Sequence, residues 1–331
     1  MMVVGMVLAA PLGLPPFYVN LSGQVLIYAI LALSLDLLAG VLGLWSLGHA
    51  AAFGVAAYTA AFLAERLGVS WGIQLISGLG VAAALGCVGG LVVMRVRGLY
   101  FMMLTLGIAQ VLWALAENWT GLTGGADGIP GIGRPSPFIT TNSFYVFLAA
   151  CFALNLLVLW AIHRSNYGLI LRGIRDNALR MEALGVATFR ARLGAYVLAS
   201  TIGGFAGVLF AWQQGLVSPG VLSVDTSAET LLMVILGGAG TLGGPILGAV
   251  IVVLLETLVS TITARWMTAL GVCYILTVLG APQGLYPVLM PKVARVFATW
   301  GRWFGGIGDG KRARVEGDSP SLRRATHPEG H

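Results

Sequence analysis

The chain has 331 residues, of which 57% are hydrophobic and 47 are glycine, whereas only 10% are charged. Soluble domains carry about 25% charged residues, so a compact soluble fold cannot cover this much apolar surface. The composition excludes a secreted domain, a disordered chain and an ordinary cytoplasmic enzyme, and it predicts an all-α, polytopic bundle of membrane helices.

Apolar runs, divided at glycine, proline and charge clusters, indicate about ten membrane segments, because one crossing takes about 20 apolar residues. The expected segments are residues 2–14, 22–40, 45–64, 71–94, 99–118, 143–163, 194–215, 228–236, 244–262 and 266–290. The first and the eighth are short.

The basic residues indicate which loops lie inside the cell. Arg95 and Arg97 follow the fourth segment, six arginines fill residues 164–193, and eight basic residues follow the tenth segment. Cytoplasmic loops retain positive charge, so ten crossings with cytoplasmic N- and C-termini place all three groups inside. A single crossing over residues 228–262 would place the last group outside, so we divide that stretch at 237–244. The net charge of +6 therefore reports sidedness, and we expect no nucleic-acid partner.

We expect a membrane domain over residues 1–290 and a polar, mobile cytoplasmic tail over residues 291–331. The membrane domain includes an outside loop over residues 119–142, which is rich in Gly, Pro and Thr and forms an ordered cap or a flexible loop. It also includes an inside loop over residues 164–193.

Apolar residues recur at steps of three or four in the inside loop and predict one amphipathic helix. These residues are Leu171, Ile174, Ala178, Met181 and Gly185. Such a helix can lie on lipid headgroups, dock into a groove of a soluble partner, or belong to an ordinary folded loop. Periodicity alone leaves all three alternatives open.

The glycine-rich break between the eighth and ninth segments is a candidate pathway element or hinge, or a tight turn between helices. Its candidate residues are Gly237, Gly238, Gly240, Gly243, Gly244 and Pro245. Asp36, His49 and Gln110 join this group because ionisable and polar side chains are costly at membrane depth. Asp36 lies toward a segment end, where we expect partial hydration, and Gln110 can line a path or bond between helices.

The sequence contains no arrangement of residues that indicates a nucleophile, a pair of catalytic carboxylates or a metal site. It also lacks a complete phosphate-binding loop, so we see no ATP site in this chain. We therefore expect no catalytic residue, no metal and no cofactor.

Several blocks resemble bacterial branched-chain amino acid ABC transporter permeases, and specifically the LivM-like member of the permease pair. The blocks are residues 32–40, 45–59, 97–106, 122–128, 172–177, 182–185 and 236–245. They occur in order and together span about residues 20–290. Asp36 is a departure, because we expect a neutral residue such as Asn there in many relatives.

The resemblance implies an importer in the bacterial inner membrane, built from two different permeases, two cytoplasmic ATP-binding subunits and a periplasmic solute-binding protein. The chain itself is then not an enzyme, and its inside loop holds the coupling helix that seats in the ATPase. The implied coupling residues are Arg172, Arg175, Asp176, Asn177, Glu182, Ala183 and Gly185. The cargo is a branched-chain amino acid or a related solute such as urea or an amide, and a stand-alone carrier or channel is the alternative function.

Overall fold

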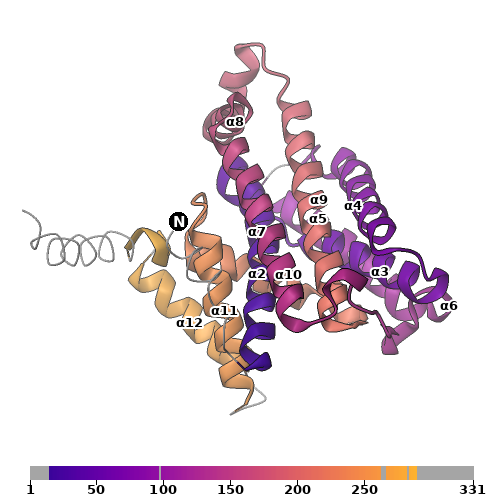
Figure 1. Ribbon diagram of the computed structural model, residues 1–331. Coiled ribbons are helices and arrows are strands. Elements are labelled where there is room, and N and C mark those ends of the chain that lie inside the picture. Colours follow the sequence, from indigo (N-terminus) through magenta and orange to yellow (C-terminus); the bar gives the residue numbers. More distant parts are fainter. Residues whose placement is uncertain (1–14, 97, 262–265, 282, 289–331) are drawn as a thin grey trace, which may run out of the picture. The chain divides into compact units, whose positions relative to one another are not determined.

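The computed structural model describes residues 15–96, 98–261, 266–281 and 283–288 (Figure 1). These residues belong to one compact unit that ends at Val288. The expected first segment and the expected C-terminal tail lie outside the described residues, as does the end of the tenth segment.

The described chain is almost entirely helical, which agrees with the expected all-α class (Figure 1). Its elements are α2 (Pro16–Asp36), the π-helix η1 (Leu37–Leu42), α3 (His49–Leu67), α4 (Trp71–Val93), α5 (Leu99–Asn118), α6 (Thr120–Thr123), η2 (Gly125–Asp127), β1 (Ile129–Pro130), η3 (Ser136–Phe138), α7 (Thr141–Arg164), α8 (Asn166–Ala183), α9 (Thr188–Gln214), β2 (Leu216–Val217), η4 (Pro219–Leu222), α10 (Val224–Gly237), α11 (Gly244–Ser260) and α12 (Trp266–Gly280). The two short strands, β1 and β2, pair antiparallel.

Five helical spans among the described residues are long and apolar enough to cross a bilayer. They are Pro16–Leu42, Trp71–Val93, Leu99–Asn118, Thr141–Arg164 and Thr188–Gln214. Three later helices are shorter, with 14 residues in α10, 17 in α11 and 15 in α12. The structure thus confirms a helical membrane bundle, and the number of ten crossings stays a prediction.

Helix α2 is the central helix of the bundle. It packs against α7, α9, α10 and α11, and the apolar stretch within Pro16–Leu42 is entirely buried. A helix that is apolar all round is stable only where other helices or lipid surround it. Neighbouring helices therefore hold α2 on every side, and its C-terminal end is a fixed point against which other elements can be placed.

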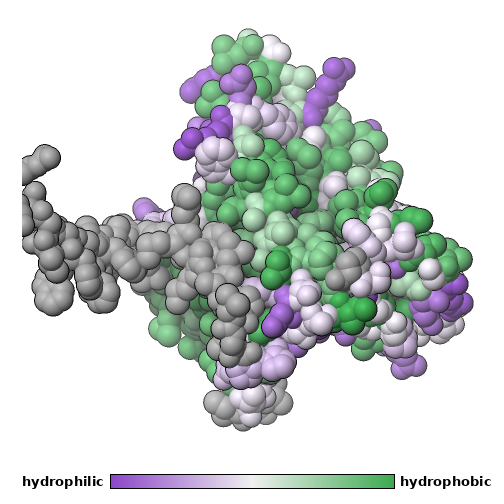
Figure 2. Space-filling view, in the orientation of Figure 1, coloured by the Kyte–Doolittle hydropathy of each residue, from purple (hydrophilic) through white to green (hydrophobic). Residues whose placement is uncertain are grey.

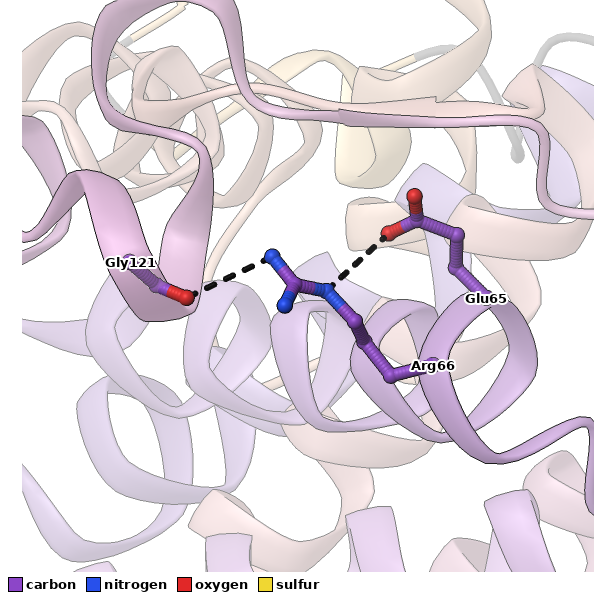
Figure 3. Close-up of polar contacts among 3 residues, drawn as sticks. All are labelled: Glu65, Arg66 and Gly121. Atoms are coloured by element: carbon purple, nitrogen blue, oxygen red, sulfur yellow. Dashed lines mark hydrogen bonds and ion pairs between the residues drawn. The ribbon is translucent and has the colours of Figure 1, made fainter.

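The loop between α5 and α7 is an ordered cap, one of the two alternatives that the sequence left open. It contains α6, η2, β1 and η3, and β1 pairs with β2 beyond α9. Arg134 donates to the Asn20 side chain near the start of α2 at 3.2 Å. Figure 3 shows the guanidinium of Arg66, at the end of α3, donating to the Gly121 carbonyl of α6 at 3.3 Å and lying 3.9 Å from the carboxylate of Glu65. We call this side of the bundle the cap end.

Helix α8 marks the opposite end of the bundle, which we call the α8 end. Because the start of α2 is bonded through Asn20 to Arg134 of the cap, and Gly40 beyond its end is bonded to Arg175 of α8, α2 leads from one end to the other. Figure 2 shows broad apolar surface, with hydrophilic residues gathered in the regions that α8 and α6 occupy in Figure 1. Large apolar side chains are exposed on α4, α5 and α7, for example Ile76, Met103 and Leu154, as expected where lipid or another membrane protein covers them.

Helices α10 and α11 form an antiparallel pair. Gly244 packs on Gly237 next to the turn, and Gly248 packs on the backbone carbonyl of Met233 one turn further away. Helix α10 begins just after β2 and η4, at the cap end, and the turn that follows it lies beside α8. The predicted break at 237–244 is therefore present, since two helices run in opposite directions on its two sides. That each of them crosses the membrane stays a prediction.

Candidate functional site

Helix α8 is kinked, whereas the sequence predicted one continuous amphipathic helix. Asn177 has φ −160° and ψ 100°, and its side-chain Oδ1 accepts a hydrogen bond from the Arg180 backbone N–H at 2.9 Å. An Asn in this position acts as the N-cap of a new helix, which competes with continuation of the old one. Helix α8 therefore consists of two short helices that meet at Asn177.

The first half of α8 is anchored on the neighbouring membrane helices. Leu171 and Ile174 are buried, as the predicted apolar face requires. Arg172 donates to the His163 carbonyl at 3.1 Å and so caps the C-terminus of α7, where a cation is favourable. Tyr167 donates its hydroxyl to the Ala191 carbonyl of α9 at 2.7 Å. These bonds tie α8 to two membrane helices at once.

The second half of α8 folds back on the first and presents an exposed surface. Met181 lies directly against Gly173. Two large apolar side chains point outward, with Leu179 70% and Leu184 72% exposed. The implied coupling residues Asp176, Asn177, Glu182, Ala183 and Gly185 are also exposed. Glu182 accepts a hydrogen bond from the Thr188 hydroxyl at 2.6 Å, which fixes the end of this half to α9.

Asp36 meets the turn between α10 and α11, which we call the glycine turn (residues 238–243). Its Oδ1 accepts a hydrogen bond from the Gly240 backbone N–H at 2.7 Å. Asp36 is only 1% exposed, whereas its place near a segment end predicted partial hydration. The contact explains the difference, because the glycine turn covers the carboxylate.

Arg175 joins the same cluster from α8. Its guanidinium donates to the Gly40 carbonyl, and its aliphatic stem packs against Gly43. The Gly40 carbonyl is available because the Leu44 N–H, which would reach it in a continuing α-helix, donates to the Leu38 carbonyl at 2.9 Å. The C-terminal end of a helix is also a favourable place for a cation such as the Arg175 guanidinium.

The backbones of η1, which continues α2, and of the glycine turn touch at Gly40 and Gly240. A side chain on Gly40 would overlap the backbone of Gly240, and Gly240 has φ +83°, a conformation that only glycine adopts readily. On its other side the turn packs against the Tyr286 ring at Gly243 and against residues 283–287 at Gly238. The glycine turn is thus a tight turn held between three parts of the chain.

Sequence reasoning singled out Asp36, the glycine turn and Arg175 separately, and the structure brings them together. It missed Gly40, Gly43 and Tyr286, which complete the contacts. The two glycines that follow Asp36 at short spacing are a signal for close backbone approach at the end of α2. Tyr286 carries no such signal, because its role depends on a neighbour more than 40 residues away.

His49 lies apart from this cluster, in a structural contact between α2 and α3. Its Nε2 is 2.7 Å from the Ser34 hydroxyl oxygen. Ser34 also bonds to the Leu31 carbonyl of its own helix at 2.6 Å. A cavity of about 10 Å³ beside His49 has room for about one water molecule. Gln110 is partly exposed on α5, and no hydrogen bond of the described residues links it to Asp36 or the glycine turn.

The described residues contain no group of three or more His, Cys, Asp and Glu side chains that could hold a metal ion. The three cysteines of the chain are free, and Cys87 is exposed. What the geometry offers is therefore mechanical. An exposed, kinked helix is hydrogen-bonded through Arg175 to the Gly40 carbonyl, and a half-buried turn is hydrogen-bonded to Asp36 of the central helix.

Comparison with known proteins places this arrangement in a family. The family described as the permease component of branched-chain amino acid transport systems matches residues 17–280. The chain belongs to this family. The permease is 32% identical over 303 residues to the high-affinity branched-chain amino acid transport system permease protein LivM of Salmonella typhimurium, covering 83% of this chain and 71% of that relative. The LivM protein of Escherichia coli gives the same identity and coverage.

Relatives named for a different cargo also match the permease. The autoinducer 2 import system permease protein LsrC of Klebsiella pneumoniae is 28% identical over 185 residues, covering 54% of this chain and 52% of that relative. No solved structure matches the permease. Family membership and the apolar helices make the chain a multi-pass membrane transport protein.

Proposed function

We propose that this chain is one of two different membrane subunits of an ABC importer, which moves branched-chain amino acids or a related small solute into the cytoplasm. Membership in the permease family over residues 17–280 is the observation that carries the proposal. Separate cytoplasmic ATP-binding subunits hydrolyse the ATP, since this sequence has no complete phosphate-binding loop. A solute-binding protein in the periplasm delivers the cargo to the pair in the bacterial inner membrane.

We infer ten crossings, with the α8 end in the cytoplasm and the cap end in the periplasm. The contact of the glycine turn with Arg175, and the start of α10 beside β2, support two crossings by α10 and α11. The predicted first crossing (residues 2–14) and the predicted tail (residues 291–331) lie outside the described residues. The basic residues between α7 and α9 support a cytoplasmic position for α8.

In this proposal α8 is the coupling helix. Its outer surface combines the apolar side chains of Leu179 and Leu184 with the charges of Asp176 and Glu182. Exposed apolar side chains among polar ones are typical of a surface that docks into a groove of a partner protein. Of the three alternatives for this loop, docking on the ATP-binding subunit fits the exposed apolar side chains of the second half, which folds back on the first half.

The cap is the proposed docking surface of the solute-binding protein. The pairing of β1 with β2, the Arg134 bond to Asn20 and the Arg66 bond to Gly121 fix its backbone. A fixed surface loses less conformational entropy on binding than a loose loop does. The cap therefore supports a specific contact outside the membrane.

The proposal is tested by purifying the tagged chain from mildly solubilised native membranes and reconstituting what co-purifies in proteoliposomes. We expect a second permease, two ATP-binding subunits and a binding protein, and ATP-dependent uptake of leucine, isoleucine or valine. ATP-dependent uptake of another small solute would retain the importer and change its cargo. Flux through this chain alone, indifferent to ATP, would establish the stand-alone carrier instead.

Two matched variants of α8 test its docking role. Leu179→Asn changes an exposed side chain on the second half, and Leu169→Asn changes one of similar exposure, 64%, on the first half. We expect Leu179→Asn to reduce recovery of the ATP-binding subunits, and Leu169→Asn to leave it near the wild-type level. Equal recovery with both variants would contradict docking through the second half.

A further inference from the structure

The proposed docking of α8 on the ATP-binding subunit assigns no role to the buried carboxylate of Asp36. A carboxylate at membrane depth is costly unless hydrogen bonds and an opposite charge compensate it. Asp36 is 1% exposed and accepts the Gly240 N–H at 2.7 Å, and the Arg175 guanidinium lies beside the same Gly240. The glycine turn thus holds the side chain directly, and a guanidinium from α8 lies next to that contact.

Arg175 links α8 to the contact between Asp36 and the glycine turn. It reaches from the exposed surface of α8 to the Gly40 carbonyl at the end of α2, and its guanidinium also lies beside Gly240. A single side chain of α8 therefore contacts both the central helix and the turn between α10 and α11.

We propose that Asp36 is a positioning residue that holds the glycine turn against the end of α2 and against Arg175, so that α8, α2 and the α10–α11 pair move as one body. This inference rests on the proposed function, since it takes α8 as the point where the ATP-binding subunit acts. It assigns Asp36 a mechanical role and no contact with solute.

The geometry explains why a hydrogen bond is needed at this place. Gly40 and Gly240 have no side chains, and the turn has a left-handed residue at its centre. Glycines allow close approach but contribute few side-chain contacts, so they leave the turn free to adopt other conformations. The bond from Gly240 to Asp36, with Arg175 beside it, selects one of them. A displacement of α8 then reaches α10 and α11 directly, and does not depend on packing through α2 alone.

The first test measures solute transported per ATP hydrolysed in proteoliposomes that contain the complete transporter. We expect Asp36→Ala to reduce this ratio by about tenfold, the loss expected for one hydrogen bond to a charged group, while ATP hydrolysis continues. Asp36→Asn keeps an acceptor for Gly240 and restores most of the ratio. A double variant with Arg175→Ala loses no more than the more impaired single variant, because both residues belong to one cluster.

Several results would overturn the inference. A wild-type ratio in Asp36→Ala, or losses that multiply in the double variant, means that Asp36 and Arg175 do not act together. Equal loss in Asp36→Asn and Asp36→Ala means that the hydrogen bond to Gly240 is not what matters. Wild-type complex that transports nothing with ATP contradicts the proposed function instead, so the two failures are distinguishable.

A distance measurement tests the inference without changing Asp36. Spin labels at Asp176 on α8 and Leu242 in the glycine turn, in a chain whose three cysteines are replaced by alanine, report their separation in the complete complex. We expect the same separation with and without bound ATP, because the two elements move together. A second pair of labels, at Asp176 and at Gly133 in the cap, is the control. Its separation should change on ATP binding and so show that the complex changes conformation. A change within the first pair on ATP binding would refute a common movement.

Discussion

The indole Nε1 of Trp212 donates a hydrogen bond to the side-chain oxygen of Gln74 at 2.7 Å, and both groups are buried. The bond joins α9 to α4, two helices that pack along much of their length. Gln74 also donates to the Val69 carbonyl at 2.9 Å, so its amide is used on both sides. Gln74 therefore serves a bond between two helices.

Replacing Gln74 tests this assignment. Gln74→Leu leaves the Trp212 N–H buried without an acceptor, which should reduce the free energy of unfolding by about 1–3 kcal/mol. The thermal unfolding midpoint of the purified protein in detergent measures the loss. Adding Trp212→Phe removes the stranded donor, so part of the loss should return. A double variant less stable than Gln74→Leu alone would show that the indole contributes through packing and not through this bond.

The close packing of α10 on α11 predicts a second stability effect. A side chain at Gly248 would overlap the Met233 carbonyl, so Gly248→Ala should force the helices apart and cost about 1–3 kcal/mol. Gly80→Ala on α4 is the matched control, because nothing lies within 4 Å of the added methyl group. We expect the control to unfold at or above the wild-type temperature. Equal midpoints for the two variants would mean that α10 and α11 are not in direct contact.

The helices were the part of the fold most accessible from the sequence. Helix α5 has the predicted bounds, Leu99–Asn118, because a continuous apolar run needs only the length of the bilayer to define it. Helix α9 begins at Thr188, six residues before the predicted start. The prediction used the apolar run alone, and the helix extends beyond that run into the polar residues before it. The periodicity of apolar residues did not predict the kink at Asn177, because the kink depends on a single side chain that caps the second half of α8.

The cluster at the α8 end was accessible only as separate parts. Asp36 was notable for its charge and residues 238–243 for their glycines, but the bond between Asp36 and Gly240 spans 204 positions of the chain. No local pattern specifies which turn will cover a buried carboxylate, since the answer depends on how α2, α10 and α11 pack. His49 is a second example, because a polar residue at membrane depth can serve a bond between helices, and no local pattern pointed to its partner Ser34.

The proposed sidedness makes a direct prediction about three exposed positions. In a chain whose three cysteines are replaced by alanine, single cysteines at Gly133, Asp176 and Thr261 should react with a membrane-impermeant maleimide in a defined order. We expect Gly133 in the cap and Thr261 after α11 to react from the periplasm, and Asp176 on α8 only after the membrane is opened. Labelling of Thr261 from the cytoplasm alone would show that α10 and α11 do not make two crossings.

The kink in α8 predicts how Asn177 contributes to the proposed ATPase contact. Asn177→Ala removes the acceptor for the Arg180 N–H, and the loss of an N-cap costs about 1 kcal/mol. Because the second half of α8 carries the exposed Leu179 and Leu184, a less stable second half should weaken binding of the ATP-binding subunit by roughly fivefold. Asn177→Ser retains a capping oxygen and should bind nearly as the wild type does. Titration of the purified ATP-binding subunit against the permease in nanodiscs measures both affinities.

Asn118→Ala, which removes an exposed amide at the far end of α5, controls for the loss of an amide as such. Wild-type affinity in Asn177→Ala would mean that the second half of α8 stays folded without its cap, or that it does not form the contact.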